Sequence, residues 1–449
     1  MKHLFSRLSP AQKIILSFLL VIFCGSLLLS LPWVQTESSQ AGYLDHLFTA
    51  VSMVCVTGLF TRSVVDTYNV WGQLLCMLLI QIGGLGILTF IGFFTMESRK
   101  KLSLKDRRIL RDSFSYGHNR TLGQFVRSIF ITTFSIEGLG ALLLMIRFIP
   151  KFGLRKGIFN SIFLAVSAFC NAGFDNFGND SLLGLQTDVL VNITLALLII
   201  TGGLGFMVWF DLATKLGGKQ KGLHFHTKVV LLLTAGLLVF GTVTSLWTEY
   251  NNPGTIGNLS FGDKLLVSFF QTVSMRTAGF SSIDYTAARP VTLFIYLLQM
   301  FLGGAPGGTA GGLKITTFLV LLLFARKEIL GLPHTNMGRR TLSPQLVQKA
   351  FGVTVIFQLT FLLGLLALGL VTDSSHRFIY LIFETVSALA TVGVTANITT
   401  SLNTAGMIVI MLLMFIGRVG PLTLMVSLNH YQPKNAATLH YSKADIMIG

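Results

Sequence analysis

The chain has 449 residues, of which 52% are hydrophobic and 12% charged, against about a quarter charged in an ordinary soluble domain. This composition excludes a water-soluble globular fold and the collagen-like, disordered and disulfide-rich classes. Lys and Arg number 34 against 18 Asp and Glu, a net charge of +16. Because the basic residues lie between apolar runs, they indicate membrane topology, and no nucleic-acid partner is expected.

Seven runs with almost no charge are each long enough to span a membrane. They cover 14–32, 70–96, 128–146, 189–210, 229–248, 350–372 and 404–428. An eighth run, 291–325, is interrupted by a Gly-rich segment, so each half reaches only part of the way across. The first run follows three basic residues like a signal peptide, but no cleavage site ends it, which predicts a retained first span.

Four shorter apolar stretches, 44–56, 158–171, 264–276 and 378–390, lie between the long runs and are too short to span. In each, a Phe precedes a Gly by ten residues: Phe48 and Gly58, Phe163 and Gly173, Phe269 and Gly279, Phe383 and Gly393. The third copy is the looser match, because its Val273-Ser274 pair is displaced by one position. A second Gly-rich signature follows at Gly83 to Gly86, Gly202 to Gly205, Gly303 to Ala305 and Gly417 to Gly420.

This internal repetition predicts an all-α integral membrane protein built from four tandem repeats of helix, re-entrant pore loop and helix. The repeats would supply eight spanning helices around a central pore. The predicted boundaries are 1–97, 98–214, 215–326 with a broken second helix, and 327–428, followed by a cytoplasmic tail at 429–449.

The distribution of Lys and Arg predicts the orientation in the plasma membrane. The segments 1–13, 97–125, 213–228, 326–349 and 429–449 hold 22 of the 34 basic residues. Basic loops face the cytoplasm, so both termini are expected there, with lipid around the helices. Eleven of the 18 acidic residues fall on the opposite side, where they would attract cations or simply form a solvated face. They include Asp45, Asp66, Asp175, Asp180, Asp188, Asp263, Asp284 and Asp373.

The glycine at the end of each short stretch predicts an ion filter. Non-helical backbone at membrane depth must be buried or line water. Glycine admits positive φ, which lets successive carbonyl oxygens face an axis and replace the hydration shell of a weakly hydrated cation. Tight helix packing is the alternative reading for any single glycine. The predicted filter residues are Val56, Thr57, Gly58, Asn171, Ala172, Gly173, Thr277, Ala278, Gly279, Thr391, Val392 and Gly393.

The break in the eighth run predicts a gate below this filter. Its residues are Gly303, Gly304, Ala305, Pro306, Gly307, Gly308, Thr309, Ala310, Gly311 and Gly312, with Lys314 at the end. Arg418 replaces a Gly of the second signature inside an apolar run, where an unpaired charge is costly. It is interpreted either as an electrostatic barrier in the pore or as a buried partner of Glu137.

No catalytic constellation is present in the sequence, so an enzyme is not expected. The Gly-rich segments lack a Gly-Lys-Ser/Thr ending, and His224 and His226 read as part of a solvated loop rather than a metal site. The four cysteines lie within or beside apolar runs and are interpreted as packing residues. We therefore expect no bound cofactor and no metal other than the transported ion.

Taken together, these motifs resemble the Trk/Ktr/HKT superfamily of potassium transporters, and the bacterial KtrB membrane subunits within it. The resemblance covers nearly the whole chain and rests on Thr57-Gly58, Ala172-Gly173-Phe174, Arg276-Thr277-Ala278-Gly279-Phe280, Thr391-Val392-Gly393, the broken helix at 303–314 and Arg418.

The resemblance implies potassium uptake down its electrochemical gradient, often stimulated by sodium, through a homodimer with one pore in each protomer. It also implies a separate cytoplasmic ring of KtrA-like subunits that control the gate through ATP and ADP. Gly58 favours potassium, because relatives with Ser at that position tend to conduct sodium. A sodium-coupled secondary transporter with alternating access is the rival, although it would need inverted repeats.

Overall fold

The computed structural model describes residues 10–86, 122–178, 181–218, 220, 222–338, 340–372 and 377–420. The predicted tail at 429–449, most of the linker at 97–125 and the ends of the runs 70–96 and 404–428 lie outside these ranges.

The described chain is helical apart from one small hairpin, and its main helices fall into four groups in chain order. The first group is α2 (Pro10–Leu29), α3 (Tyr43–Cys55) and α5 (Val70–Leu85), and the second is α8 (Leu122–Phe152), α9 (Leu154–Phe169), α10 (Val189–Gly203) and α11 (Phe206–Leu216). The third is α12 (Phe225–Glu249), α13 (Phe261–Ser274), α14 (Pro290–Phe301) and α15 (Ile315–Ile329), and the fourth is α16 (Pro344–Val371), α17 (Phe378–Leu389) and α18 (Thr404–Val419). Short elements are α4 (Val64–Thr67), η1 (Pro32–Val34), η2 (Leu183–Leu185), η3 (Thr399–Ser401), β1 (Asn336–Met337) and β2 (Arg340–Thr341).

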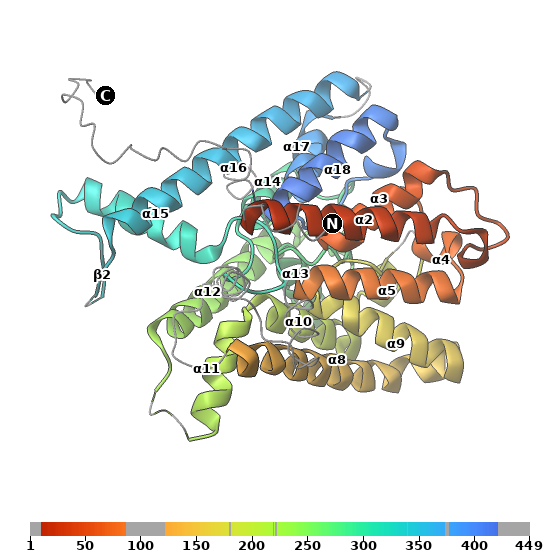
Figure 1. Cartoon of the computed structure of the whole chain (residues 1–449), viewed down its shortest axis with the longest axis horizontal. Coiled ribbons are helices and arrows are strands. Elements are labelled where there is room, and N and C mark those ends of the chain that lie inside the picture. Colours follow the sequence, from red (N-terminus) through yellow and green to blue (C-terminus); the bar gives the residue numbers. More distant parts are fainter. Residues whose placement is uncertain are drawn as a thin grey trace, which may run out of the picture.

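The four groups pack in a closed ring around their short helices α3, α9, α13 and α17, which we call the pore helices (Figure 1). The helix after each pore helix contacts the pore helix of the next group: α5 packs on α9, α10 on α13, and α14 on α17. The ring closes because α18 packs on α3. The four segments predicted as repeats therefore surround a common centre.

A close contact between the two long helices recurs in every group. A methyl group built on Gly25, Gly140, Gly241 or Gly364 would lie 2.8, 2.7, 3.0 or 2.6 Å from side-chain atoms of Leu79, Leu198, Gln299 or Leu413, respectively. Each of these partners stands four residues before the second Gly-rich signature. Small residues thus let the helix backbones approach closely, as is common where helices pack within a membrane.

Within the described residues, the second long helix is interrupted in the second and third groups, whereas the sequence predicted an interruption only in the third. The run 189–210 forms α10 and α11, which meet at an angle of 97°. The break follows from Gly205, whose φ of +89° is incompatible with a continuing helix. In the third group, α14 and α15 are separated by the irregular segment 302–314, as predicted.

Within the described ranges, four helices are long and apolar enough to cross a membrane, or five if α10 and α11 count as one span. Shorter apolar helices are α5, α14, α17 and α18. The arrangement with eight spans stays a prediction.

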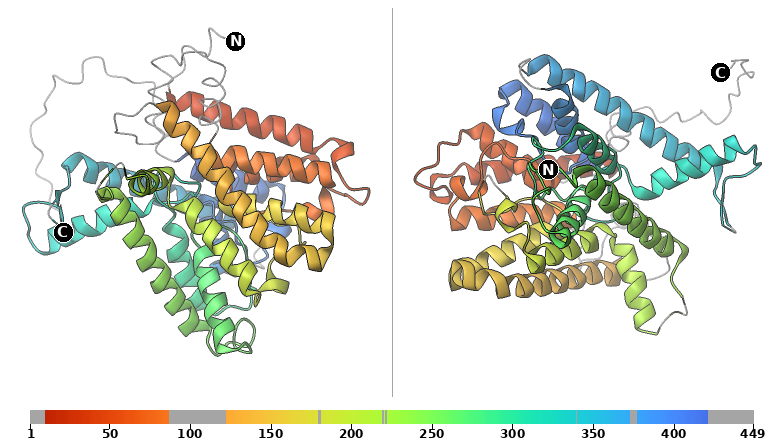
Figure 2. Two further views of the ribbon diagram at one scale, coloured as in Figure 1. Left: turned by 90° about the horizontal axis from the view of Figure 1, so that it is seen from below. Right: turned by 180° about the vertical axis from the view of Figure 1, so that it is seen from behind.

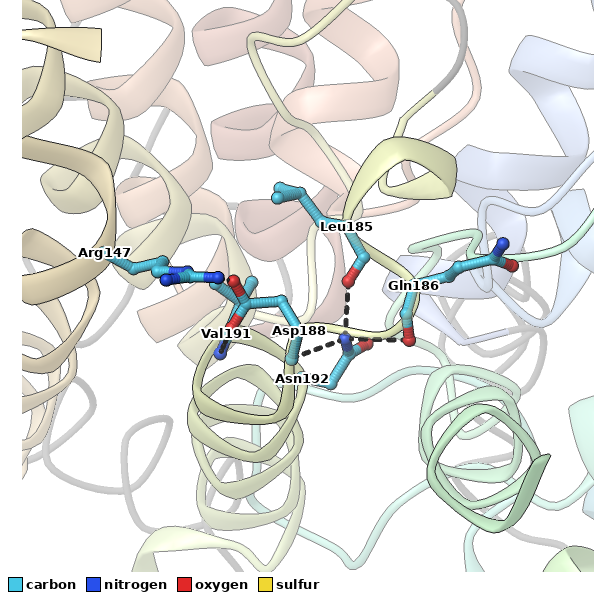
Figure 3. A network of polar contacts seen from close by, with 6 residues as sticks. All are labelled: Arg147, Leu185, Gln186, Asp188, Val191 and Asn192. Carbon is cyan, nitrogen blue, oxygen red and sulfur yellow. Dashed lines mark hydrogen bonds and ion pairs between the residues drawn. The ribbon is translucent and has the colours of Figure 1, made fainter. Parts of the chain in front are cut away.

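Two peripheral features complete the fold. Helix α15 and the adjoining first part of α16 lie side by side and project from the ring, and the hairpin β1–β2 joins them, while the rest of α16 packs on α17 and α18 (Figures 1 and 2). In the second group, Asp188 caps the N-terminus of α10, because its carboxylate accepts from the backbone NH of Val191 at 3.2 Å. The same carboxylate pairs with Arg147 of α8 (Figure 3). Asn192 donates to the carbonyl oxygens of Leu185, Gln186 and Asp188, which closes the turn before α10.

Candidate filter and loop

The backbone alternates in the same way in all four predicted filter turns. The first and third residues of each triplet have positive φ, while the middle residue does not. The φ values are +55° and +109° for Val56 and Gly58, +58° and +69° for Asn171 and Gly173, +67° and +82° for Thr277 and Gly279, and +53° and +95° for Thr391 and Gly393. A non-glycine residue in this region costs about 1–2 kcal/mol. The conformation therefore has to be held by its surroundings.

The four turns meet at the centre of the ring. A methyl group built on Gly58 would lie 2.9 Å from the carbonyl oxygen of Ala172, and one on Gly173 would lie 2.8 Å from that of Ala278. A methyl group on Gly279 would lie 2.6 Å from the oxygen of Val392, and one on Gly393 would lie 1.9 Å from that of Thr57. Each glycine thus faces the middle carbonyl of the next turn, and no side chain larger than hydrogen fits there.

Serines of the pore helices hold three of these turns. The backbone NH groups of Thr57, Ala172 and Val392 each donate at 2.8 Å to the carbonyl oxygen of Ser52, Ser167 or Ser387. The hydroxyls of the same serines accept from the NH groups of Gly58, Phe174 and Gly393 at 3.2, 3.0 and 3.1 Å. The serines of the sequence pairs Val51-Ser52, Val166-Ser167 and Val386-Ser387 therefore fix these turns to their pore helices.

The third turn is built differently, and one sequence correspondence there is wrong. Ser274 lies one residue closer to its glycine, and its hydroxyl donates to the carbonyl oxygen of Phe280 at 2.5 Å. Phe48, Phe163 and Phe383 are fully buried, but in α13 the buried residue is Phe270, while Phe269 is only half-buried. The equal spacing from Phe269 to Gly279 is thus a coincidence of a register shifted by one residue.

The second Gly-rich signature packs against the end of the pore helix. A methyl group on Gly83, Gly202 or Gly417 would lie 2.3, 1.9 or 2.0 Å from the carbonyl oxygen of Val54, Phe169 or Leu389, respectively. Each of these carbonyls stands four residues before the filter glycine. In the third group, Gly303 instead approaches the carbonyl oxygen of Gly311. Tight packing, which was the alternative reading of the filter glycines, applies to this second set.

The predicted gate segment lies directly against the filter turns and α10. The NH groups of Ala305 and Thr309 donate to the carbonyl oxygens of Gly203 and Gly202 at 2.9 and 3.2 Å. The NH of Gly311 donates to the hydroxyl of Thr277 at 3.2 Å, and the hydroxyl of Thr309 donates to the carbonyl oxygen of Phe169 at 3.1 Å.

The same segment also contacts the fourth turn and folds back on itself. A methyl group on Gly311 would overlap the hydroxyl of Thr391 at 1.9 Å. Lys314 turns back and donates to the carbonyl oxygen of Ala310 at 2.7 Å. The loop is therefore held by the second, third and fourth groups together.

Arg418 joins this loop to the first group. Its guanidinium donates to the carbonyl oxygens of Thr309 and Gly83, and to that of Gly84 at 3.3 Å. The pairing with Glu137 considered from the sequence is not formed. The carboxylate of Glu137 instead accepts from the amide of Gln81 at 3.1 and 3.3 Å.

Several acidic residues predicted to attract cations have local partners. Asp45 accepts from Thr61, Asp188 pairs with Arg147, and Asp175 accepts from Ser181 at 2.7 Å. Asp180 and Asp373 lie outside the described residues.

At the other end of the molecule, the ring of His224 contacts the carboxylate of Asp211. No cluster of metal-binding side chains occurs in the described part of the chain.

The comparisons with known proteins agree with this architecture. Residues 7–438 match the TrkH family, described as "Cation transport protein". The chain belongs to the TrkH family of cation transport proteins. It is 39% identical to the Ktr system potassium uptake protein B of Bacillus subtilis, over 99% of this chain and 97% of that protein. It is also 39% identical to the potassium/sodium uptake protein NtpJ of Enterococcus hirae, over 100% of this chain and 99% of that protein.

A solved structure supports the fold itself. The potassium transporter TrkH from Vibrio parahaemolyticus superimposes with a TM-score of 0.73, over 93% of this chain and 84% of that chain, at 17% identity. Membership of this family, together with the apolar helices, makes the chain a multi-pass membrane transporter and not an enzyme. The sequence-based resemblance to potassium transporters is confirmed at the level of the family.

Proposed function

We propose that the chain takes up potassium across the plasma membrane through a channel-like filter lined by backbone carbonyl oxygens. The observation that carries the proposal is the alternating φ pattern in four turns that meet at one centre. Alternation of this kind turns successive carbonyls toward the same side, and a ring of carbonyls can replace the hydration shell of potassium.

The surroundings of the turns favour a cation. The four pore helices end at the turns, so the negative ends of their dipoles lie nearest to the centre. The hydroxyl oxygens of Thr57 and Thr391 are buried and have no hydrogen-bond partner among the described residues. A buried polar oxygen left without a partner is costly, and a bound cation would satisfy it.

In the same proposal, residues 303–312 with Lys314 form an intramembrane gate that Arg418 holds closed. The loop and the guanidinium are joined by a direct hydrogen bond at the carbonyl of Thr309, which gives the gate a fixed closed position. A cytoplasmic KtrA-like nucleotide-binding ring, a homodimer and stimulation by sodium belong to this proposal. The name Ktr system of one relative supports a further subunit, and the name potassium/sodium uptake protein of another supports an involvement of sodium.

Ion flux in vesicles tests the proposal. The purified chain in potassium-loaded vesicles should take up rubidium at a rate that follows the membrane potential, with little uptake of sodium. A fixed ratio of sodium to potassium moved per cycle, with saturating slow turnover, would instead establish the rival carrier with alternating access.

A further inference from the structure

Beyond the filter glycines, each chain segment that leaves a filter turn is tied to its own pore helix by a hydrogen bond between side chains. We call these four contacts the outer clamps. They join Thr61 to Asp45 at 2.6 Å, Asn176 to Asn160 at 2.7 Å, Gln271 to Ser282 at 2.8 Å, and Thr395 to Glu384 at 2.7 Å. The member on the outgoing segment stands two or three residues after the glycine in every case.

All four clamps attach the outgoing segment to the pore helix, although the residues that form them differ. In the first two groups the partner on the pore helix stands 13 residues before the glycine, whereas in the third and fourth it stands eight or nine residues before. The donors and acceptors include hydroxyls, amides and carboxylates. Different side chains at different levels of the pore helix make these bonds, so the shared feature is the attachment of the outgoing segment.

The fourth clamp is the most extensively bonded. Glu384 is fully buried in α17, and its second carboxylate oxygen accepts from Thr399. The hydroxyl of Thr395 donates to Glu384 and also accepts from the NH groups of Ile398 and Thr399 at 3.2 and 3.4 Å. The third clamp is similarly extended, because Gln271 also accepts from the hydroxyl of Tyr285 at 2.6 Å.

Together with backbone contacts to serines, the clamps attach each filter turn to its pore helix on both sides of the glycine. The residue before each glycine donates its NH to the carbonyl oxygen of Ser52, Ser167, Ser274 or Ser387, and the clamps hold the chain after the glycine. A turn attached on both sides cannot easily move inward to surround a smaller ion. We propose that the outer clamps are positioning elements that set the preference for potassium over sodium by keeping the carbonyl ring at a fixed width. This proposal rests on the carbonyl filter proposed above.

The clamp of the first group gives the cleanest test. Thr61→Val removes the hydroxyl and keeps the shape, while Thr61→Ser keeps the hydroxyl. Asp45 is half-exposed, so water can replace the lost partner and folding should be preserved. Thr395→Val repeats the test in the fourth group. Thr244→Val serves as a matched control, because the Thr244 hydroxyl bonds only to backbone carbonyls within α12.

The measured quantity is the ratio of potassium to sodium flux of the full chain in vesicles, with thermal unfolding of the same samples. Thr61→Val should lower the ratio about fivefold, the scale of one hydrogen bond, without a lower unfolding temperature. Thr61→Ser and Thr244→Val should keep the parental ratio.

An unchanged ratio for a folded Thr61→Val, or an equal loss in Thr61→Ser or Thr244→Val, would overturn the clamp while leaving the filter intact. A parent chain that conducts without preferring potassium would overturn the filter and the clamp with it.

Discussion

Individual glycines decide where backbones can touch in this molecule. Gly58 and Gly393 both have positive φ and both face a carbonyl oxygen of the adjacent turn. Gly178 also has a positive φ of +100°, but no atom lies within 4 Å of a methyl group built on it. Gly178 therefore meets only the demand of the backbone conformation, whereas Gly58 and Gly393 also allow a neighbouring carbonyl to approach closely.

Gly58→Ser is expected to weaken the discrimination between potassium and sodium. Its Cβ would lie 2.9 Å from the carbonyl oxygen of Ala172, so a filter carbonyl has to move. Gly178→Ser is the matched control, because it carries the same φ penalty of about 1–2 kcal/mol without a clash. Selectivity measured by competing rubidium and sodium fluxes checks this. Equal selectivity in parent and Gly58→Ser would contradict the filter assignment.

Arg418→Gln is expected to raise basal flux in the absence of any cytoplasmic partner, by about tenfold if one charge-assisted hydrogen bond of about 1.4 kcal/mol holds the gate. The reason is that the guanidinium is the group that joins Thr309 to Gly83. Vesicle flux and circular dichroism on the same preparation check the outcome. A variant that fails to fold would show that Arg418 acts as a structural crosslink and not as a barrier.

At the scale of elements, the loop 303–314 and the bent pair α10 and α11 form one unit. The backbone NH of Phe206, at the start of α11, donates to the carbonyl oxygen of Gly307 at 2.9 Å, while the loop donates back to Gly202 and Gly203. The helix break at Gly205 thus provides the backbone groups that hold the loop. A continuous helix over 189–210 would have used those groups internally.

Deleting residues 305–311 should therefore raise flux without the partner, because the proposed gate, which lies against the predicted filter turns, is removed. Thr309→Val is a milder form of the same test. It removes the bond to the carbonyl of Phe169 and should raise flux by a smaller factor. Rubidium uptake into vesicles measures both variants. A folded deletion that stays silent would show that the loop is not the gate.

At the scale of the whole molecule, the ring closes because α18 reaches α3, and the hairpin of α15 and α16 projects from it. The distribution of basic residues predicts that this hairpin and both termini face the cytoplasm. The segment between α12 and α13 would then face outward.

Labelling of single cysteines checks this orientation. In a Cys24→Ala background, His334→Cys should react with a membrane-impermeant maleimide only after the membrane is opened. Asn258→Cys should react in intact cells. Both positions are exposed, and the other cysteines are buried in the described structure. Reversed accessibility would invert the proposed topology.

The sequence by itself predicted the membrane class, most of the helices, the four glycine turns that meet at the centre and the broken third group, because apolar runs and glycine spacing are local properties of the chain. It also found the second Gly-rich signature. Only the tertiary structure showed that Gly83, Gly202 and Gly417 pack on pore-helix carbonyls, that Phe270 replaces Phe269 in the core, and that Arg418 binds Thr309 rather than Glu137. These features depend on which backbone groups from distant segments face each other, and no local pattern specifies that.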